Sequence, residues 1–302
     1  MKKVVMSVIA ALAVTAAAPA FAADMPVKAK PVVPAVAPSP FDIAIGGVVM
    51  SDYIFRGISQ SNHAASGGAY FEPQLNTSVG TFYVGLGALA ISWPSGPGYG
   101  FTDPSAEVDI YGGWRTTLGP VALDLGAIYY YYPGETNNGF TTNSDFIEFY
   151  GKASMEVVKG LTLGVNLFYT PDLLHYSETF STLGISNKPD AFYVSGTAKW
   201  VTPWEYNGIG SYISGELGFW SIDDAGFMLA GATDDPSYAY WNVGIALTYK
   251  ALTLDLRYHD TNQSVQDCAN FLLVGVPNSS NDWCDARFVA SLKFDTTLSA
   301  LK

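Results

Sequence analysis

Three histidines, His63, His175 and His259, are the side chains of this sequence best suited to acid–base chemistry, because an imidazole titrates near neutral pH. Asp260 and Ser264 follow His259, so the residue types of a hydrolase triad occur close together. A triad is defined by geometry in space, however, and no Gly-x-Ser-x-Gly turn is present to expose a serine nucleophile. We therefore expect solvated loop histidines, no catalytic residues and no enzymatic activity. A barrel enzyme acting on lipids remains a further alternative.

The chain contains two cysteines, Cys268 and Cys284. Both fall between an expected strand that ends near Asp260 and another that begins near Arg287. An even pair in an oxidising compartment is typical of a disulfide, whereas a metal site or a catalytic thiol would need partner residues close by. We predict a disulfide between Cys268 and Cys284, no metal site and no cofactor.

Most charged side chains alternate with apolar ones along the sequence. Between residues 105 and 117, Glu107, Asp109 and Arg115 share one parity, and apolar residues occupy the other. A period of two is typical of a β-strand with two chemically different faces. The same alternation recurs in residues 121–132, 147–157, 192–200 and 238–257.

The composition indicates strands that cross a membrane. Hydrophobic residues make up 49% of the chain and charged residues only 14%, yet no stretch beyond the N-terminal leader approaches the ~20 apolar residues of a spanning helix. Connections near Gly80, Gly119, Gly160 and Ala251 are very short, that of Thr202–Gly208 is intermediate, and the alternate connections are long. Barrels with short periplasmic turns and long outer loops have this asymmetry.

The segments give about 12 strands, which begin near Phe41, Ala69, Thr81, Ser105, Val121, Ser144, Leu161, Asp190, Ile209, Tyr238, Leu252 and Arg287. We predict an all-β fold, a transmembrane antiparallel up-and-down β-barrel over residues 41–302, with Tyr53 and Phe55 in an aromatic row on its outer surface. A soluble, secreted β-sandwich is the alternative fold, because the sequence alone does not distinguish the inner face of a strand from the outer one.

The N-terminus has the pattern of an export signal. Lys2 and Lys3 precede a short apolar run, and Ala20-Phe21-Ala22 resembles a cleavage site, so residues 1–22 are predicted to be a signal peptide. Residues 23–40 contain five prolines and are predicted to be a periplasmic linker. These segments predict a location in the cell outer membrane.

If apolar residues face lipid, charged residues must face the lumen, because Arg or Lys at the lipid-facing midplane costs about 2 to 4 kcal/mol. Arg56 is expected to pair with Asp52, four residues away, or with a neighbouring strand. Acidic residues are in excess, which favours cations weakly. About 12 strands leave open whether the lumen is a pore or is plugged. The candidate pore-lining residues are Asp52, Arg56, Glu72, Glu107, Asp109, Arg115, Asp124, Glu148, Lys152, Lys199, Glu216, Asp255 and Arg257.

The run Ser51-Asp52-Tyr53-Ile54-Phe55-Arg56-Gly57-Ile58-Ser59-Gln60-Ser61 resembles the N-terminal signature of the TorF-type porins, a proteobacterial family. The resemblance extends through Gly68-Ala69-Tyr70-Phe71-Glu72 and Phe82-Tyr83-Val84-Gly85 to about Trp93. It implies a channel for small solutes. The chain departs from many bacterial barrels in ending Leu301-Lys302 rather than in an aromatic residue, which bears on its assembly signal more than on its fold.

These observations together predict a porin-like outer-membrane channel for the passive diffusion of small hydrophilic solutes. A plugged structural or adhesive surface barrel is the alternative function. The net charge of −12 becomes −14 without Lys2 and Lys3, which argues against nucleic acid as a partner. The expected partners are outer-membrane lipid, lipopolysaccharide and the solutes.

Overall fold

We describe a computed structural model of the chain over residues 40–93, 104–135, 143–182, 188–223, 237–265, 267–268 and 282–301. The predicted signal peptide, residues 1–22, lies outside these residues. So does the predicted linker of residues 23–40, apart from its last residue, Pro40.

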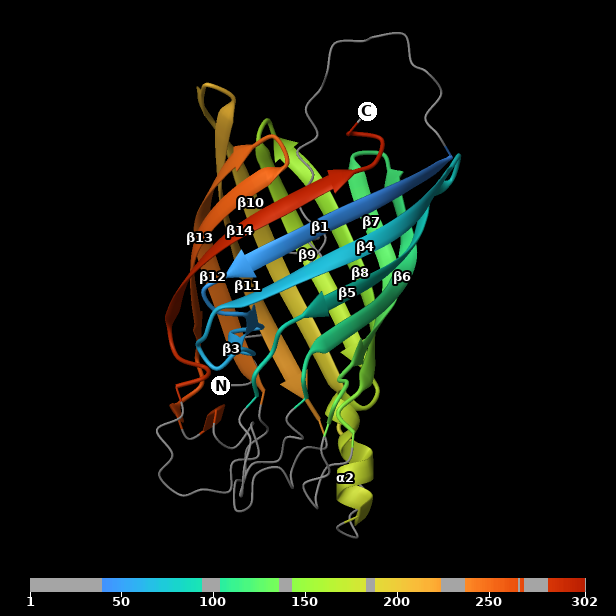
Figure 1. Cartoon of the computed structure of the whole chain (residues 1–302), viewed down its shortest axis with the longest axis vertical. Coiled ribbons are helices and arrows are strands. Elements are labelled where there is room, and N and C mark those ends of the chain that lie inside the picture. Colours follow the sequence, from blue (N-terminus) through green and yellow to red (C-terminus); the bar gives the residue numbers. More distant parts are fainter. Residues whose placement is uncertain are drawn as a thin grey trace.

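Twelve antiparallel strands close into a barrel, in which each strand pairs with its neighbours in the sequence and β1 pairs with β14 (Figure 1). This confirms the predicted fold class and strand number. The strands are β1 (Phe41–Met50), β4 (Ser66–Thr77), β5 (Gly80–Leu89), β6 (Glu107–Leu118), β7 (Val121–Tyr131), β8 (Phe146–Val158), β9 (Leu161–Thr170), β10 (Ala191–Tyr206), β11 (Ile209–Ile222), β12 (Tyr238–Tyr249), β13 (Leu252–Thr261) and β14 (Arg287–Thr297).

All turns at one end of the barrel contain two residues, which are residues 78–79, 119–120, 159–160, 207–208 and 250–251. The prediction of an intermediate connection at Thr202–Gly208 is wrong, because β10 continues to Tyr206 through a register shift after Val201. Asn207 and Gly208 then form the tight turn, both with positive φ (48° and 81°), as a two-residue hairpin turn requires.

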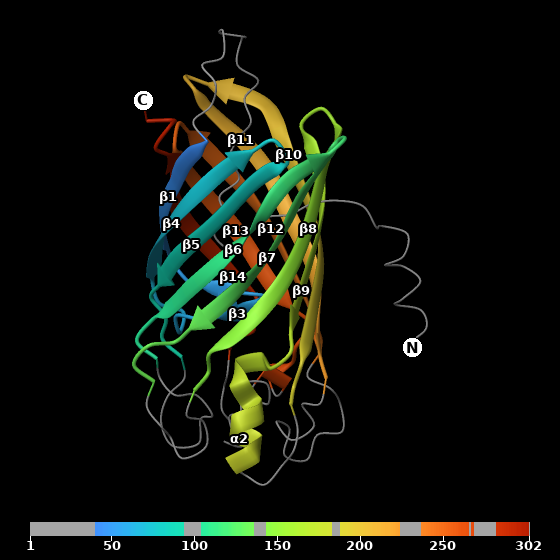
Figure 2. The same cartoon turned by 90° about the vertical axis from the view of Figure 1, so that its right-hand side faces the viewer.

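The strand ends that the long connections join lie together at the opposite end, which we call the loop side; the end with short turns is the turn side (Figures 1 and 2). One long connection contains the 3₁₀ turn η1 (Leu173–His175) and the helix α2 (Tyr176–Thr182), which extends beyond the strands. Neither α2 nor any other helix among the described residues is long and apolar enough to cross a membrane.

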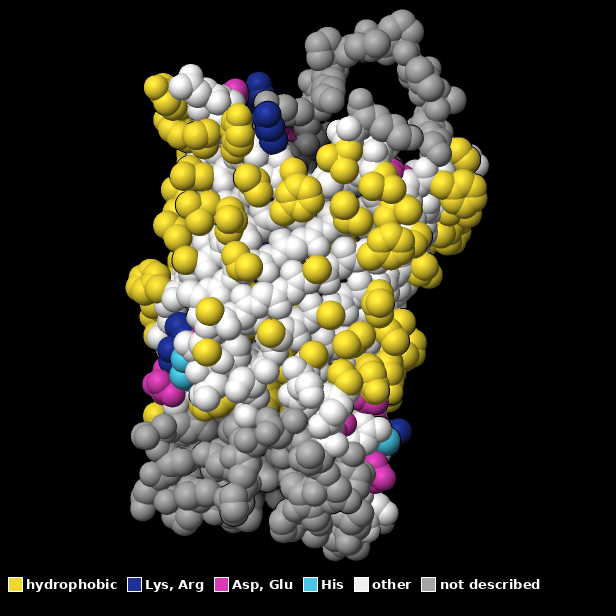
Figure 3. All heavy atoms as spheres, in the orientation of Figure 1, with side chains coloured by type: hydrophobic (Ala, Val, Ile, Leu, Met, Phe, Trp, Pro, Cys, Tyr) yellow, Lys and Arg dark blue, Asp and Glu magenta, His cyan; other side chains and the backbone are white. Residues whose placement is uncertain are grey.

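The outer surface of the barrel is apolar. On the face shown in Figure 3, hydrophobic side chains are spread over the wall, and the charged side chains lie near its two ends. This is the surface of a barrel that meets lipid, and the closed topology excludes the alternative of a two-sheet sandwich. Outward-facing residues that expose 47% to 64% of their surface include Val84, Ile110, Leu217, Val243, Ile245 and Leu256.

Val243 lies midway along β12, between Gly215 and Tyr258 on the adjacent strands, and faces outward. We expect Val243→Arg to lower the free energy of unfolding in lipid vesicles by about 2 to 4 kcal/mol, because it places a charge on the lipid face. Urea titration of refolded protein measures this change. Val243→Leu is the matched control, and equal stability of the two variants would contradict a lipid-facing β12.

The first long connection, residues 51–65, turns back into the barrel. It contains β2 (Ile54–Phe55) and β3 (Ile58–Ser59), which pair only with each other and lie within the barrel in both views (Figures 1 and 2). We call residues 54–59 the hairpin. Tyr53 is only 5% exposed and Phe55 packs against the interior core, so the prediction that both lie in an outer aromatic row is wrong.

Candidate functional site

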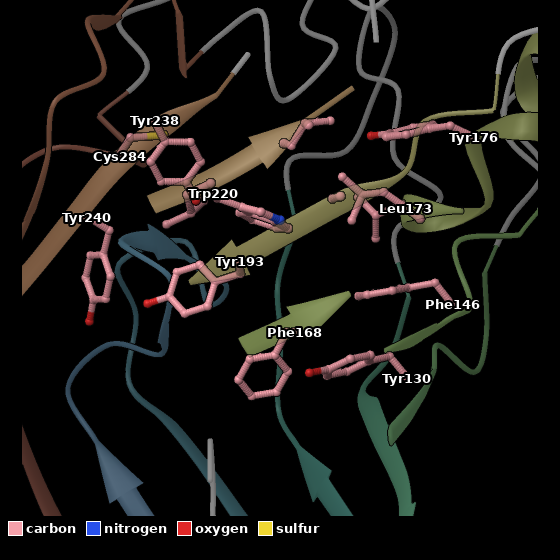
Figure 4. Close-up of a cluster of buried hydrophobic side chains, with 14 of the residues drawn as sticks. Tyr130, Phe146, Phe168, Leu173, Tyr176, Tyr193, Trp220, Tyr238, Tyr240 and Cys284 are labelled. Carbon is pink, nitrogen blue, oxygen red and sulfur yellow. The ribbon is translucent and has the colours of Figure 1, made fainter. Parts of the chain in front are cut away.

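Aromatic side chains fill the loop-side half of the barrel interior. Tyr130, Phe168, Tyr193 and Trp220 project from their strands towards the same part of the interior (Figure 4). They occupy positions of inward parity, where polar residues would be expected in an open lumen. The loop-side half is therefore a packed core.

The tip of the hairpin places Arg56 in this core. Arg56 and Gly57 both have positive φ, 47° and 87°, as the two central residues of a tight hairpin turn require. A Cβ at Gly57 would lie 2.8 Å from the ring of Tyr240. Glycine at this position is therefore needed both for the turn and for the close approach of the hairpin to the wall.

The Arg56 guanidinium forms a two-point ion pair with Glu148 of β8. Its Nη1 and Nη2 donate to Glu148 Oε1 and Oε2, each at 2.9 Å, and Tyr130 Oη donates to Oε2 at 3.1 Å. Glu148 is 1% exposed and Arg56 7% exposed. Tyr238 Oη also donates to the Arg56 carbonyl, at 2.9 Å. Arg56 therefore pairs with a strand 92 residues away, not with Asp52.

Aromatic rings surround the same guanidinium. Its central carbon lies 4.3 Å from the ring centre of Tyr193, 4.6 Å from that of Trp220 and 5.0 Å from that of Phe168. The ring of Phe55, on the hairpin itself, lies 4.6 Å away. Such distances give cation–π attraction, which is stronger in a desolvated site. We call the wall residues Glu148, Phe168, Tyr193 and Trp220 the Arg56 cage.

Asp52 anchors the base of the hairpin. Its Oδ1 accepts hydrogen bonds from Ser59 Oγ at 2.7 Å and Ser61 Oγ at 2.9 Å. Its Oδ2 lies 3.2 Å from His63 Nδ1 and 3.5 Å from Arg287 Nε. Asp52 thus ties the connection to itself and to β14.

His63 bridges Asp52 to Asp282, whose Oδ1 lies 3.0 Å from His63 Nε2. Burial raises the pKa of the Asp282 carboxyl, but the neighbouring His63 and Arg287 outweigh burial and hold the pKa below its usual value. Because the pKa is lowered, the stabilisation contributed by the ionised Asp282 carboxylate is lost as the pH falls through the lowered value.

Glu107 and Asp109 lie together on the inner face of β6, near the hairpin. Glu107 accepts hydrogen bonds from Tyr53 Oη at 2.6 Å and Tyr132 Oη at 2.9 Å. Asp109 is 3% exposed, and its Oδ1 has no hydrogen-bond partner among the described residues. The hairpin therefore lies beside one satisfied and one incompletely satisfied carboxyl group.

A second polar network ties the strands together nearer the turn side. Arg115 donates to both carboxylate oxygens of Glu72, at 2.6 and 3.1 Å, and its Nε donates to Asp124 Oδ2 at 3.1 Å. Tyr83 donates to Asp124, and its ring centre lies 3.6 Å from the Arg115 guanidinium carbon. The network joins β4, β5, β6 and β7.

The remaining predicted residues also face the interior. Arg257 pairs with Asp255 at 2.8 Å. Glu216 accepts from Tyr193 Oη at 2.8 Å. Lys152 and Lys199 lie over aromatic rings, with Lys152 Nζ 4.5 Å from the ring centre of Tyr150 and Lys199 Nζ 4.1 Å from that of Tyr212.

All thirteen candidate residues thus lie inside the barrel, but Asp52 and Arg56 belong to the inserted connection and not to the wall. Whether the set lines a solute path stays a prediction. The aromatic members of the Arg56 cage were missed by sequence reasoning. Their signal was available, because Phe168, Tyr193 and Trp220 share the parity of the polar residues on their strands.

The histidines form no hydrolase triad within the described residues. His259 faces inward from β13 and lies 3.0 Å from Tyr240 Oη, so the prediction of a solvated loop residue is wrong for it. Ser264 Oγ donates to Asp267 instead, at 2.6 Å. His175 lies in η1, 3.8 Å from Glu178.

The predicted disulfide between Cys268 and Cys284 is confirmed. The segment it holds contacts the hairpin, because the Ser59 amide donates to the Trp283 carbonyl at 2.9 Å. The Cys284 carbonyl accepts from Thr261 Oγ1 at the end of β13, also at 2.9 Å. The disulfide therefore holds in place the segment around Trp283, which contacts both the hairpin and the end of β13.

Replacing both cysteines by alanine is expected to speed hydrogen exchange at the Ser59 amide at least tenfold. A cross-link over a loop of this size stabilises by about 3 kcal/mol, and its loss frees the Trp283 segment. The amide of Val243, in the middle of β12, should exchange as in the parent protein. Exchange at Ser59 that does not change would show that the disulfide does not support the hairpin.

Residues 34–293 match the model of a family described as a bacterial protein of unknown function (Gcw_chp). The chain belongs to the Gcw_chp family. That description assigns no activity, and the more specific resemblance to TorF-type porins stays a prediction. No curated protein sequence matches the chain.

Among solved structures, this Gcw_chp chain is similar to the NanC porin, with 10% identity and a TM-score of 0.47 over 84% of this chain and 98% of that one. It is also similar to an outer membrane channel from Pseudomonas putida F1 (10% identity, TM-score 0.46, 90% and 100% covered). LpxR from Salmonella typhimurium matches at 8% identity and a TM-score of 0.41, over 83% and 99%. At this level of similarity no function transfers to the present chain.

Proposed function

We propose that this chain is a porin-like channel of the bacterial outer membrane, exported through a cleaved signal peptide, through which small hydrophilic solutes diffuse passively. The apolar outer wall would contact lipid and lipopolysaccharide. The observation that carries the proposal is the polar inner wall of a closed barrel, which has a separate hairpin seated in its loop-side half. A hairpin that pairs with no wall strand can be displaced without breaking the barrel.

The two halves of the interior differ in the way that a channel with one constriction would. Close to the turns, several inward residues are polar and half-buried, so solvent reaches them; these include Thr162, Thr248, Thr253 and Lys293. Further into the barrel, Glu72 and Tyr83 of the Arg115 network are buried. On the loop side, the hairpin and the aromatic core fill the interior. The hairpin is thus the constriction of the proposed path. The excess of carboxylates inside supports a preference for cations.

A plugged structural or adhesive barrel is the second candidate, and one observation favours it. The buried charges nearest the hairpin are largely paired, with Glu148 bound by Arg56 and Glu107 by two tyrosines. A barrel whose interior never opens would satisfy its buried groups in this way.

Single-channel recording of the refolded mature protein in a planar bilayer tests the proposal. We expect stepwise currents and, in a salt gradient, a reversal potential that shows cations to be preferred. If folded protein is silent both as the parent chain and without its hairpin, the channel is excluded in favour of the plugged barrel. Release of fatty acid or sugar from added lipid or lipopolysaccharide would instead establish an enzyme.

A further inference from the structure

The Arg56 cage has the composition of a binding site, although its present occupant is a side chain of the same protein. It combines one fully buried carboxylate, Glu148, with the rings of Phe168, Tyr193 and Trp220 around a single guanidinium group. Carboxylates and ring faces attract cations. A buried carboxylate is costly unless it is paired and hydrogen-bonded, so an empty cage would favour a cation that fits it.

All four residues of the cage belong to the wall, and Phe55 of the hairpin packs edge-on against one of them, Trp220, with ring centres 5.9 Å apart. Tyr130 Oη donates to Glu148, and Tyr193 Oη donates to Glu216 at 2.8 Å, so neighbouring strands orient both groups. Gly218 leaves the space that the Tyr193 ring occupies, since a Cβ there would lie 2.7 Å from ring atom Cε2. The ring of Trp220 packs edge-on against Tyr238, 5.8 Å away. These wall contacts, and Phe55, remain when only the Arg56 side chain is removed, so the cage should then keep its shape.

The geometry favours a guanidinium group over other cations. Both oxygens of Glu148 accept from two nitrogens of one planar group, which an ammonium ion does not reproduce and a quaternary ammonium cannot, since it has no N–H. Lys152 shares one ring of the cage, with its Nζ 5.1 Å from the ring centre of Phe168, but it lies closer to Tyr150, at 4.5 Å, and forms no ion pair with Glu148 in the part of the chain that the structure describes. Lys152 therefore does not replace Arg56 at Glu148.

We propose that the Arg56 cage is a binding site for small solutes that carry a guanidinium group, and that Arg56 occupies it as a built-in ligand. A solute of this class would bind Glu148 and the three rings when the hairpin is displaced. The inference rests on the proposed channel function for the passage of such solutes. Binding itself requires only the cage.

Arg56→Ala empties the cage while the rest of the hairpin stays, and guanidinium is the probe. We expect millimolar guanidinium chloride, far below denaturing concentrations, to raise the melting temperature of detergent-solubilised Arg56→Ala in a saturable way. The parent protein, whose cage is occupied, should show no such rise. If Arg56→Ala fails to fold alone, guanidinium present during refolding should restore the folded barrel. If guanidinium neither stabilises the variant nor rescues its folding, the proposal is wrong.

The matched control is Arg56→Ala combined with Glu148→Gln, which keeps the shape of the cage and removes its charge. We expect guanidinium to bind the double variant at least tenfold more weakly, because one charge-assisted, two-point contact is lost. Equal affinity for both variants would show that guanidinium acts elsewhere. Tetramethylammonium and potassium are the competing probes, and binding of either as tightly as guanidinium would overturn the assignment to this class of solute.

Bilayer recordings separate this inference from the proposed function. If guanidinium binds the cage but no variant conducts, the channel is excluded and the binding site stands. If the hairpin-deleted protein conducts but the cage binds no guanidinium, the channel stands and the inference is wrong. Block of the Arg56→Ala current by guanidinium, and not by tetramethylammonium, would support both.

Discussion

Deleting the hairpin, residues 54–59, is expected to raise the single-channel conductance severalfold. Tyr53 and Gln60 lie at its two ends, and the Gln60 amide donates to the Tyr53 carbonyl at 2.6 Å, so two glycines can join them without strain. The hairpin carries Phe55, Arg56 and Ile58 into the loop-side half of the lumen. Its removal leaves an opening in the aromatic core of the loop-side half.

The deletion should also strengthen the preference for cations, because Glu148 loses the guanidinium that neutralises it. Current–voltage curves in a salt gradient measure both effects. The same deletion combined with Glu148→Gln should keep the large conductance and lose the added preference. Deletion of residues 28–33, in the predicted linker, is the control for a shortened chain. A folded, hairpin-less barrel with unchanged current would contradict the role of the hairpin as the constriction.

Arg115→Met is expected to destabilise the barrel by roughly 3 kcal/mol. In the part of the chain that the structure describes, Arg115 is the cation that pairs with Glu72, which is 2% exposed, and with Asp124. Removing one partner of a buried ion pair leaves an uncompensated buried charge, which costs about 3 to 5 kcal/mol, and the partial exposure of Arg115 places the loss near the lower limit. Urea unfolding of protein refolded in lipid vesicles measures the change.

Two variants show whether the loss comes from the network. Combining Arg115→Met with Glu72→Gln should recover part of the stability, because the most deeply buried charge is then removed. Lys293→Met removes an inward-facing lysine that forms no ion pair within the described residues, and it should change stability little. If Arg115→Met were no more destabilising than Lys293→Met, Arg115 would not hold β4 to β6 and β7.

Much of the fold could be predicted from local sequence patterns. A period of two sets which side chains share a face, and a lipid-facing wall leaves the charged parity only the interior. The short turns fixed the pairing of successive strands, and so the strand number. Asn207-Gly208 is a typical sequence for a two-residue hairpin turn. The continuation of β10 to this turn was not predicted, because Pro203 and the register shift after Val201 interrupt the strand pattern.

The hairpin also had a local signal, since Arg56-Gly57 between apolar residues is compatible with a tight turn. Its two strands contain only two residues each. An alternation of apolar and polar residues cannot be recognised over so short a length, so the sequence does not separate these strands from the end of β1. For the same reason, the sequence placed Tyr53 and Phe55 on the outer surface.

By itself, then, the sequence predicted a barrel of about 12 strands, the two faces of each strand and the disulfide, because each follows from neighbours along the chain or from a single pair of residues. Closure of the barrel decided that the apolar faces point outward and the charged faces inward. Only the tertiary structure decided that the first connection folds inward and that Arg56 binds Glu148 within three rings from three other strands. These contacts join residues 92 or more positions apart. They depend on barrel closure and on side-chain volume, which no local period of the sequence records.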